Sequence, residues 1–361
     1  MRVLTVNAGS SSLKLRLLDG EALAASVELR APSGRADADE LRRALTAMPP
    51  PDAVGHRVVH GGTRFTGPVR LDDESIAALR ALTPLAPLHQ PAALDGIAAV
   101  AAMLPEAPAV ACLDTAFHSG LPPAAATYAL PEEWRQKHAL RRFGFHGLSH
   151  AYASRRAGEL LGRDDLRVVT CHLGAGASLA AVTSGRSVDT TMGFTPVEGL
   201  VMATRSGSVD PGMLLWLLEH GGLEVGEVSD ALEHRSGLLG LAGTADMREL
   251  LERAERGDDR AALARAVYVH RLRGQVASMA AAMDGLDALV FTGGVGERSS
   301  AIRAAVASGL GFLGVAIDAV ADEATAPDAD VSAAHARVHT LVIAAREDLE
   351  IARQVREVLA G

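Results

Sequence analysis

Residues 3–20 read VLTVNAGSSSLKLRLLDG, and this stretch decides how the first part of the chain folds. Two apolar runs flank a turn of small residues, and Asp19-Gly20 closes the second run. This pattern predicts a β-hairpin with a polar tip. At the tip, Gly9 would let an anion approach backbone N–H groups. We therefore expect the tip to hold phosphate, although an ordinary edge hairpin with a serine-rich turn would carry the same residues.

Composition supports a functional tip. Asn7 is the only asparagine of the chain, and Lys14 is one of only two lysines. The rest of the sequence contains no asparagine and a single lysine, yet both residue types occur in this hairpin.

A second stretch repeats the plan of the first. Residues 167–185 read RVVTCHLGAGASLAAVTSG, so that at an offset of 165 His172 matches Asn7 and Gly174 matches Gly9. One repeat this short could arise by chance, but two phosphate-type hairpins, one in each half, suggest a duplicated architecture that holds a nucleotide between its halves.

Length, charge and cysteine content bound the class of protein. The 361 residues exceed one hydrophobic core, which predicts two domains. The net charge of −9 and the 3% aromatic content argue against nucleic-acid binding. No apolar run is long enough to cross a bilayer and the N-terminus lacks a secretion signal, so we expect a cytoplasmic protein without a membrane partner. Cys112 and Cys171 lack metal-ligand spacing, and we expect them to be buried thiols.

Two charged residues occur in apolar strand-like runs. Arg57 stands in the middle of VGHRVVHGG, where a buried guanidinium needs an anion or a carboxylate partner. Asp114 follows the run Ala109–Leu113, which we predict to be a buried parallel strand. The carboxyl end of such a strand is where open α/β sheets bind ligands. Alternatively, Asp114 caps a following helix.

Three further segments are candidates for a site. The stretch 84–91 is too rich in proline for a regular element, and its His89 is either structural or part of a site. The segment 189–212 reads as a long ordered loop, which is usually functional. A predicted strand at Ala288–Thr292 runs into a loop with the sequence GGVGE. Its spacing is neither that of a dinucleotide fingerprint nor that of a P-loop.

Ten motifs together resemble the acetate kinase family, within the superfamily of acetate and sugar kinases, heat-shock chaperone ATPases and actin. They are VNAGSSSLK, GHRVVHGG, APLH, LDTAFH, FGFHGLSH, CHLGAGAS, DTTMGFTPVEGL, ATRSGSVDP, FTGGVGE and REDLEIA. The resemblance implies phosphoryl transfer from ATP to acetate, giving acetyl phosphate and ADP, with Mg²⁺ or, in its place, Mn²⁺. It also implies a homodimer and two actin-like (ribonuclease H-like) α/β domains around a nucleotide cleft, residues 1–115 plus 349–361 and residues 116–348.

The resemblance further implies roles for single residues. Arg57 would contact the substrate carboxylate, His146 and Arg205 the transferring phosphoryl group, and Asp114 would orient Mg²⁺ or an arginine. Asn7 and Glu347 would lie near the metal. The substrate pocket would be lined by Val59, Leu88, His89, Phe145 and Pro196. The nucleotide would contact Ser10, Ser12, Lys14, His172, Leu173, Gly174, Ala175, Gly176, Asp246, Met247, Arg248, Gly294, Val295, Gly296, Glu297 and Arg298.

Some residues depart from the family pattern, namely Ala175, Arg298, Ala345 and Arg346. Each replaces a polar residue that the family carries near the nucleotide, which leaves base preference open. Two alternatives therefore stand beside an acetate kinase: a propionate or butyrate kinase of the same fold, and a nucleotide-binding relative without catalysis. The retained candidate catalytic residues argue against the second alternative, because a binding module does not need groups that act in the transition state.

Overall fold

The computed structural model describes residues 1–8, 12–31, 36–87 and 89–360. The predicted hairpin tip at Gly9 and Ser10 and the predicted pocket residue Leu88 lie outside these ranges. The chain divides into two compact units. The first comprises Met1–Gly120, Phe145–Tyr152 and Arg346–Gly361, and the second comprises Leu121–Gly144 and Ala153–Ala345. The sequence-based domains placed residues 116–120, 145–152 and 346–348 in the second part, whereas here they group with the first.

The first unit contains a mixed six-stranded sheet in the order β3-β2-β1-β4-β6-β5. Strands β1, β4 and β6 are parallel, and the other pairs are antiparallel. The bounds are β1 (Arg2–Ala8), β2 (Ser12–Asp19), β3 (Ala22–Arg30), β4 (Ala53–Val58), β5 (Val69–Arg70) and β6 (Ala109–Leu113).

The second unit repeats this topology, with a sheet in the order β9-β8-β7-β10-β12-β11. Here β7, β10 and β12 are parallel, and β7 and β8 form the hairpin that corresponds to β1 and β2. The bounds are β7 (Arg167–Leu173), β8 (Ala177–Thr183), β9 (Arg186–Thr190), β10 (Ala288–Thr292), β11 (Ala329–Asp330) and β12 (His339–Val342). The predicted α/β fold with duplicated halves is confirmed.

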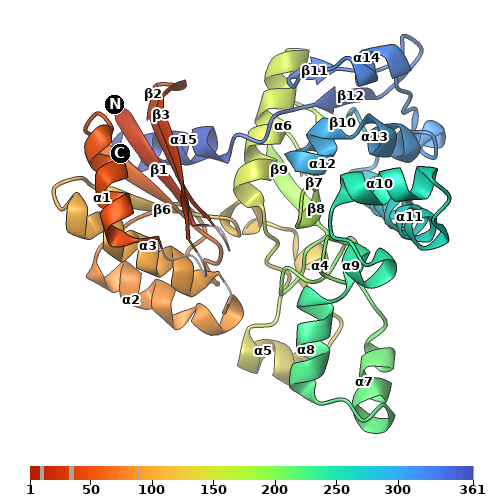
Figure 1. The fold of residues 1–361 in the computed structure, drawn as a ribbon, viewed down its shortest axis with the longest axis horizontal. Coiled ribbons are helices and arrows are strands. Elements are labelled where there is room, and N and C mark those ends of the chain that lie inside the picture. The colour runs from red at the N-terminus through yellow and green to blue at the C-terminus, as the bar shows by residue number, and fades with distance from the viewer. Residues whose placement is uncertain (9–11, 32–35, 88, 361) are drawn as a thin grey trace. The chain divides into compact units, whose positions relative to one another are not determined.

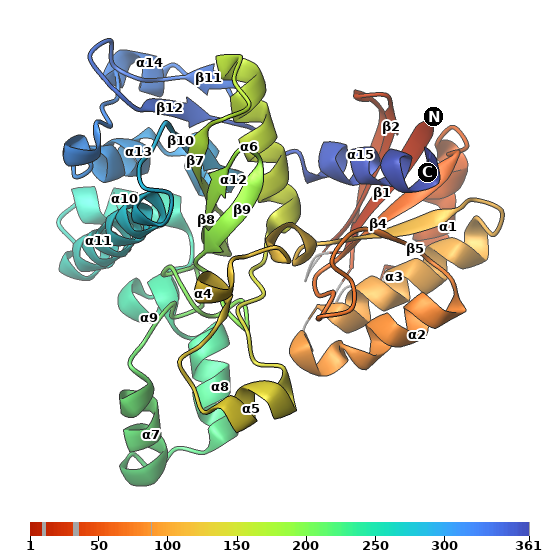
Figure 2. The same ribbon diagram turned by 180° about the vertical axis from the view of Figure 1, so that it is seen from behind.

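The central strands of the first sheet carry apolar residues on both faces, and both faces are buried under helices. In β1, Leu4 and Val6 join a core cluster with Leu41 of α1 and Val100 of α3. The alternate residue Val3 joins another cluster with Ile351 of α15. Figures 1 and 2 show α2 and α3 on one face of this sheet and α15 on the other. The period of two in a β-strand thus divides the core into two layers.

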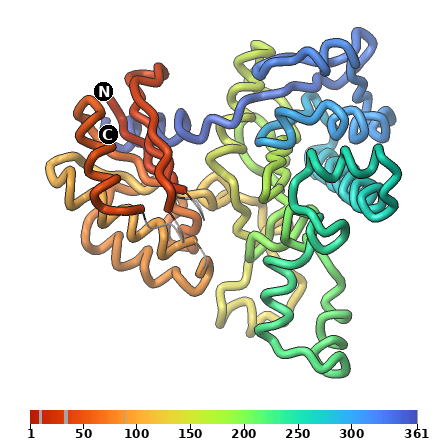
Figure 3. Tube along the Cα trace, viewed as in Figure 1, coloured from red at the N-terminus to blue at the C-terminus, as the bar shows by residue number. Residues whose placement is uncertain are grey.

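The helices of the first unit are α1 (Ala38–Ala47), α2 (Asp73–Ala81), α3 (Gln90–Met103) and α15 (Glu347–Ala360), with the 3₁₀ turns η2 (Thr83–Leu85) and η3 (Ala116–His118). Figure 3 shows the C-terminal segment, in blue, lying beside the red N-terminal strands. Its close approach depends on Gly55 of β4, because a Cβ there would clash with Ile351 and Val355.

Helix α6 (Gly147–Leu161) begins in the first unit and ends in the second. The remaining helices belong to the second unit, in which α11 packs on β7, β8 and β9. They are α4 (Pro123–Ala126), α5 (Glu132–His138), α7 (Pro211–His220), α8 (Val225–His234), α9 (Gly237–Ala242), α10 (Met247–Glu255), α11 (Asp259–Ala282), α12 (Gly293–Arg298), α13 (Ser300–Ala307), η4 (Gly311–Leu313) and α14 (Ala319–Glu323).

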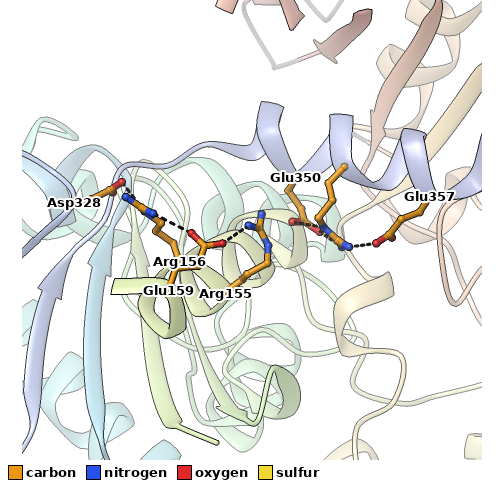
Figure 4. A network of polar contacts seen from close by, with 7 residues as sticks. Arg155, Arg156, Glu159, Asp328, Glu350 and Glu357 are labelled. Atoms are coloured by element: carbon orange, nitrogen blue, oxygen red, sulfur yellow. Dashed lines mark hydrogen bonds and ion pairs between the residues drawn. The ribbon is translucent and has the colours of Figure 1, made fainter. Parts of the chain in front are cut away.

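Two groups of ion pairs line α6 and α15 (Figure 4). In the second unit, Glu159 lies 2.9 Å from Arg155 and 3.0 Å from Arg156, which also pairs with Asp328. In the first unit, Arg353 pairs with Glu350 at 2.6 Å and with Glu357 one turn later. Pairs three or four residues apart lie on one helical face and stabilise the helix modestly.

Two local predictions are wrong. The proline-rich stretch 84–91 is partly regular, because η2 contains Pro84 and α3 begins at Gln90 with Pro91 in its first turn. A proline is tolerated there because the first helical N–H groups have no partner within the helix. The GGVGE segment, predicted as a loop, forms the short helix α12. No helix in the described ranges combines the length and the apolar character that a membrane span requires.

Candidate active site

Four polar residues meet at the carboxyl edge of the first sheet. Asn7 and Arg57 lie near the ends of the parallel strands β1 and β4, Asp114 directly follows β6, and Glu347 is the first residue of α15. Because these parallel strands are neighbours, their carboxyl ends place the side chains together, as in other open α/β sheets.

Arg57 is the centre of this cluster. Its Nη2 donates to Asp114 Oδ2 at 2.7 Å, and its Nε lies 3.2 Å from both carboxylate oxygens. On the other side of the guanidinium, Nη1 donates to Asn7 Oδ1 at 3.2 Å and lies 3.6 Å from Glu347 Oε2. Asn7 Nδ2 in turn donates to the same Glu347 oxygen at 3.0 Å. The structure thus brings together four of the predicted site residues.

Burial makes the interactions of the cluster strong. Asp114 is 1% exposed, and this burial raises the pKa of its carboxyl group, with Arg57 opposing the shift. Burial of Arg57 acts to lower its pKa, but attraction to Asp114 and Glu347 outweighs burial and raises the pKa. Arg57 therefore remains a cation. The Asp114 carboxylate accepts from Arg57, and the following turn η3 has no side-chain cap. The alternative that Asp114 caps a helix is therefore wrong.

The turn at 145–147 is anchored to Asp114. The Gly147 N–H donates to the Asp114 backbone oxygen at 2.9 Å, and His146 adopts a φ of 57°, which L-residues rarely adopt. Phe145 is buried, with its ring 5.6 Å from that of His60 and its carbonyl 3.1 Å from His118 Nε2. Burial lowers the pKa of His60 and of His118 to about 4 each, so both rings are neutral near pH 7.

The second unit contains a cavity of about 720 Å³. Apolar and small side chains form most of its wall, and Asp246, Arg248 and Arg298 add charge. It is lined by Gly174, Ala175, Ala203, Leu238, Ala245, Asp246, Met247, Arg248, Leu251, Tyr268, Gly294, Val295, Arg298, Ser299, Ser300 and Ala301. This volume lies in the range typical of small-molecule sites.

Local sequence shapes this cavity. The β7–β8 hairpin turns through Gly174-Ala175-Gly176, and the Ala203 N–H donates to the Ala175 oxygen at 3.0 Å. Gly293 begins α12 with a φ of +79°, and a Cβ there would lie 2.8 Å from the Leu173 oxygen. Only glycine fits where α12 leaves β10 this close to β7. Asp246 caps α10 by accepting from the Arg248 N–H at 2.8 Å.

Eight of the predicted nucleotide residues line the cavity: Gly174, Ala175, Asp246, Met247, Arg248, Gly294, Val295 and Arg298. His172, Leu173, Gly176, Gly296 and Glu297 belong to the same unit but not to the lining. Ser12 and Lys14 belong to the first unit, where Lys14 Nζ lies 3.9 Å from Glu28 on the neighbouring strand. Ser10 lies outside the described residues.

The other predicted residues divide between the two units. Arg205 is half-buried on the loop between β9 and α7, where burial lowers the pKa of its guanidinium and Glu233 opposes the shift. Val59 directly follows β4, and His89 occupies the position before α3, both in the first unit. Pro196 lies in the second unit.

Sequence reasoning missed half of the cavity wall. Leu238, Leu251 and Tyr268 line the cavity from the helices α9, α10 and α11, where apolar residues read as ordinary core. Ala203 and Ala245 line it from loops, and Ala203 belongs to the 189–212 segment that was predicted to be functional. Ser299, Ser300 and Ala301 also line it, and their position directly after GGVGER was a signal that could have found them.

No group of three or more histidine, cysteine or carboxylate side chains with metal-binding geometry occurs among the described residues. The donor set at the carboxyl edge nevertheless suits Mg²⁺. This ion usually binds one or two carboxylates together with substrate phosphates and water rather than a complete cage of protein ligands. Glu347 supplies a carboxylate, and Asn7 supplies an amide oxygen that also accepts from Arg57 Nη1.

Comparison with known proteins identifies the family. The profile of the Acetokinase family matches residues 39–353. A protein named acetate kinase from Synechococcus sp. is 50% identical over 311 residues, which cover 85% of this chain and 77% of that protein. The crystal structure of Porphyromonas gingivalis acetate kinase matches with a TM-score of 0.91 and 36% identity over 99% of each chain. A propionate kinase from Francisella tularensis matches with a TM-score of 0.89 and 36% identity over 98% of each chain.

Proposed function

The chain belongs to the acetokinase family, and from this premise we propose how its own residues transfer a phosphoryl group from ATP to acetate. The observation that carries the proposal is the Arg57–Asp114 pair, held with Asn7 and Glu347 at the carboxyl ends of adjacent strands.

The chemistry needs no general base. A small carboxylic acid has a pKa of about 4 to 5 and is ionised near pH 7, so its oxygen is ready to attack phosphorus. The difficulty is the repulsion between two anions and the charge that spreads over the transferring phosphoryl group. Catalysis is therefore positioning together with positive potential.

Arg57 supplies positive potential for the substrate carboxylate, and Asp114 orients it. Both Asp114 oxygens face the guanidinium, which fixes the plane of Arg57. This geometry favours an orienting carboxylate over one that accepts a proton. The Nε and Nη2 donors of Arg57 lie on one rigid plane and match the two oxygens of the Asp114 carboxylate. A lysine could not pair in this way.

His146 and Arg205 serve the transferring phosphoryl group. His146 sits in the turn whose next residue is hydrogen-bonded to Asp114, so its backbone is tied to the Arg57 cluster. Arg205 remains charged because a guanidinium group stays protonated in proteins at neutral pH. Its charge would stabilise negative charge as the bond to ADP breaks.

Glu347 and Asn7 are the residues that would hold Mg²⁺ or Mn²⁺. The bound ion would neutralise part of the charge on the ATP phosphates. The hydrogen bond from Asn7 Nδ2 to Glu347 Oε2 orients that carboxylate. The cavity of the second unit would hold the nucleoside of ATP or ADP, since it combines an apolar wall with two arginines.

The substrate is acetate, with propionate as a slower alternative. We assign recognition of the substrate to the described apolar residues Val59, Phe145 and Pro196, together with His89. Apolar contacts distinguish one extra methylene by only about 1 to 3 kcal/mol. The similarity to a propionate kinase makes propionate the second candidate.

Hydroxylamine trapping of acyl phosphate tests the proposal. With Mg-ATP, acetate should give the most hydroxamate, propionate less and butyrate least; a clear lead for butyrate would overturn the substrate assignment. Arg205→Ala should lower kcat on the order of 100-fold with a smaller change in the KM for acetate. Arg265→Ala, a change at an exposed arginine of α11, is the control. An unchanged kcat in Arg205→Ala would remove that residue from the reaction.

We also propose a cytoplasmic homodimer. Cys112 and Cys171 are buried free thiols, in keeping with a reducing compartment. Helix α7 has no buried residue, while Leu215 and Trp216 are 58% and 57% exposed. A second copy of the chain would cover this apolar helix, and sedimentation velocity measures the oligomeric state directly.

A further inference from the structure

Arg303 on α13 is a buried cation that the reaction does not use. It is 2% exposed, and its counter-ion Asp322 on α14 is also 2% exposed. Replacing a buried ion pair by apolar residues is often neutral or stabilising, so such a pair gives weak evidence for a role in stability alone. What Arg303 contacts suggests another role.

The guanidinium links three short helices. Its Nη1 donates to the backbone oxygens of Gly296 and Glu297 at 2.8 and 2.9 Å, so it satisfies carbonyl groups of α12. Its Nε donates to Asp322 Oδ1 at 2.6 Å, and its Nη2 donates to the Asp322 backbone oxygen at 3.0 Å. One planar side chain therefore joins α12 to α14 from its own position on α13.

The first turn of α12 is held by another side chain. Glu297 Oε1 accepts from the Gly293 N–H at 3.1 Å and from the Ala345 N–H at 2.9 Å. A helix of six residues does not form by itself, because helix nucleation is unfavourable. The position of α12 therefore depends on the side chains of Arg303 and Glu297, and Glu297 acts by accepting from backbone N–H groups.

The cavity depends on the same helix. Gly294, Val295 and Arg298 of α12 line it, followed by Ser299, Ser300 and Ala301 at the start of α13. Any movement of α12 relative to α13 would change this wall.

We propose that Arg303 is a positioning residue for nucleotide binding, which holds α12 at the wall of the cavity through the Gly296 and Glu297 carbonyl groups. The inference rests on the proposed role of this cavity. Arg303 acts through the backbone of α12, and Asp322 compensates its charge.

The decisive variant is the double change Arg303→Met with Asp322→Leu. It removes both buried charges together, so neither is left unpaired, but it also removes the donors to α12. We expect calorimetry to show an increase of about tenfold in the Kd for ADP, the scale of a lost charge-assisted hydrogen bond. The KM for acetate should stay unchanged. A folded double variant with the wild-type Kd would overturn the proposal.

Arg303→Lys is the second variant, and it keeps the proposal testable if the double variant fails to fold. Lysine keeps the charge but loses the planar fork that reaches both α12 and α14. The Kd for ADP should rise here as well, and a wild-type value would contradict the proposal.

The matched control is Arg167→Lys. Arg167 forms a similar pair with Asp287, with Nε 3.0 Å from Oδ2, at a site that does not line the cavity. It should leave the Kd for ADP unchanged. If the wild-type protein itself binds no ADP, the proposed function of the cavity fails; if the wild type binds and the Arg303 variants bind equally well, this inference alone fails.

Discussion

Gly147→Ala tests whether the 145–147 turn positions the reacting groups. A Cβ at residue 147 would lie well under 3.0 Å from the Asp114 backbone oxygen and 2.9 Å from the Phe117 Cβ. The Asp114 oxygen is also the acceptor for the Gly147 N–H, so the clash falls on the hydrogen bond that joins the two segments. Relief of the clash requires the backbones to separate by about 1 Å, and a displacement of that size near the chemistry can cost about 100-fold in rate.

The assay is hydroxamate formation at saturating acetate and Mg-ATP. We expect kcat to fall about 100-fold, because His146 and Asp114 flank the clash on the two segments. A loss of about 1 to 3 kcal/mol in the free energy of unfolding should accompany it, as for other overpacked sites. Circular dichroism at the assay temperature would verify that the variant is folded.

Gly96→Ala is the matched control. Gly96 lies inside α3, and nothing lies within 4 Å of the Cβ that the change would add. Alanine in a helix interior is more favourable than glycine by about 0.8 to 1 kcal/mol, so this variant should be at least as stable as the wild type, with the wild-type kcat. A folded Gly147→Ala variant with the kcat of Gly96→Ala would refute the argument that this turn positions the site.

Two further predictions concern charge. Asp114→Asn removes the carboxylate charge 2.7 Å from Arg57 Nη2 and should lower the free energy of unfolding by about 3 kcal/mol. It should also lower kcat. Chemical denaturation measures the first effect and the hydroxamate assay the second, and a fully active variant would exclude an orienting role for Asp114. Burial lowers the pKa of His56 from 6.5 to about 3, so below pH 6.5 the unfolded chain binds a proton that the folded protein does not. Above pH 6.5 the buried neutral ring of His56 does not lower the free energy of unfolding. Below pH 6.5 the free energy of unfolding falls by up to about 1.4 kcal/mol per pH unit as the pH decreases toward the pKa of His56 in the folded protein. The difference between the urea midpoints at pH 7 and pH 4.5 should therefore be smaller in His56→Gln than in the wild type. An unchanged difference would contradict the lowered pKa of His56.

The duplicated architecture could be predicted because hairpins are local. The apolar runs around 3–20 and 167–185 determine two-stranded units by alternation and turn chemistry alone. Both form as predicted, as β1–β2 and β7–β8. The predictions that failed were also local. Pro91 is compatible with the first turn of α3 as well as with a loop, and the glycines of GGVGE are compatible with the short helix α12 as well as with a loop. Only contacts with neighbouring elements select between these conformations.

The candidate site divides in the same way. Arg57 and Asp114 could be recognised from sequence, because a charge in an apolar strand requires a partner and a strand end is where ligands bind. That they pair with each other, and that Glu347 joins Asn7 across 340 residues, follows from the order of the sheet and the return of α15. The apolar wall around Tyr268 gave no signal, because burial in a core and burial at a cavity favour the same residues.

The amino-acid sequence by itself determined the two hairpins, their duplication and the residue types that the chemistry requires, because periodicity and turn propensity act over a few residues. Only the tertiary structure decided which charges pair, which helices close the cavity and which buried cation holds them in place. Those contacts join residues far apart in the chain, and their energies depend on burial that no local pattern specifies.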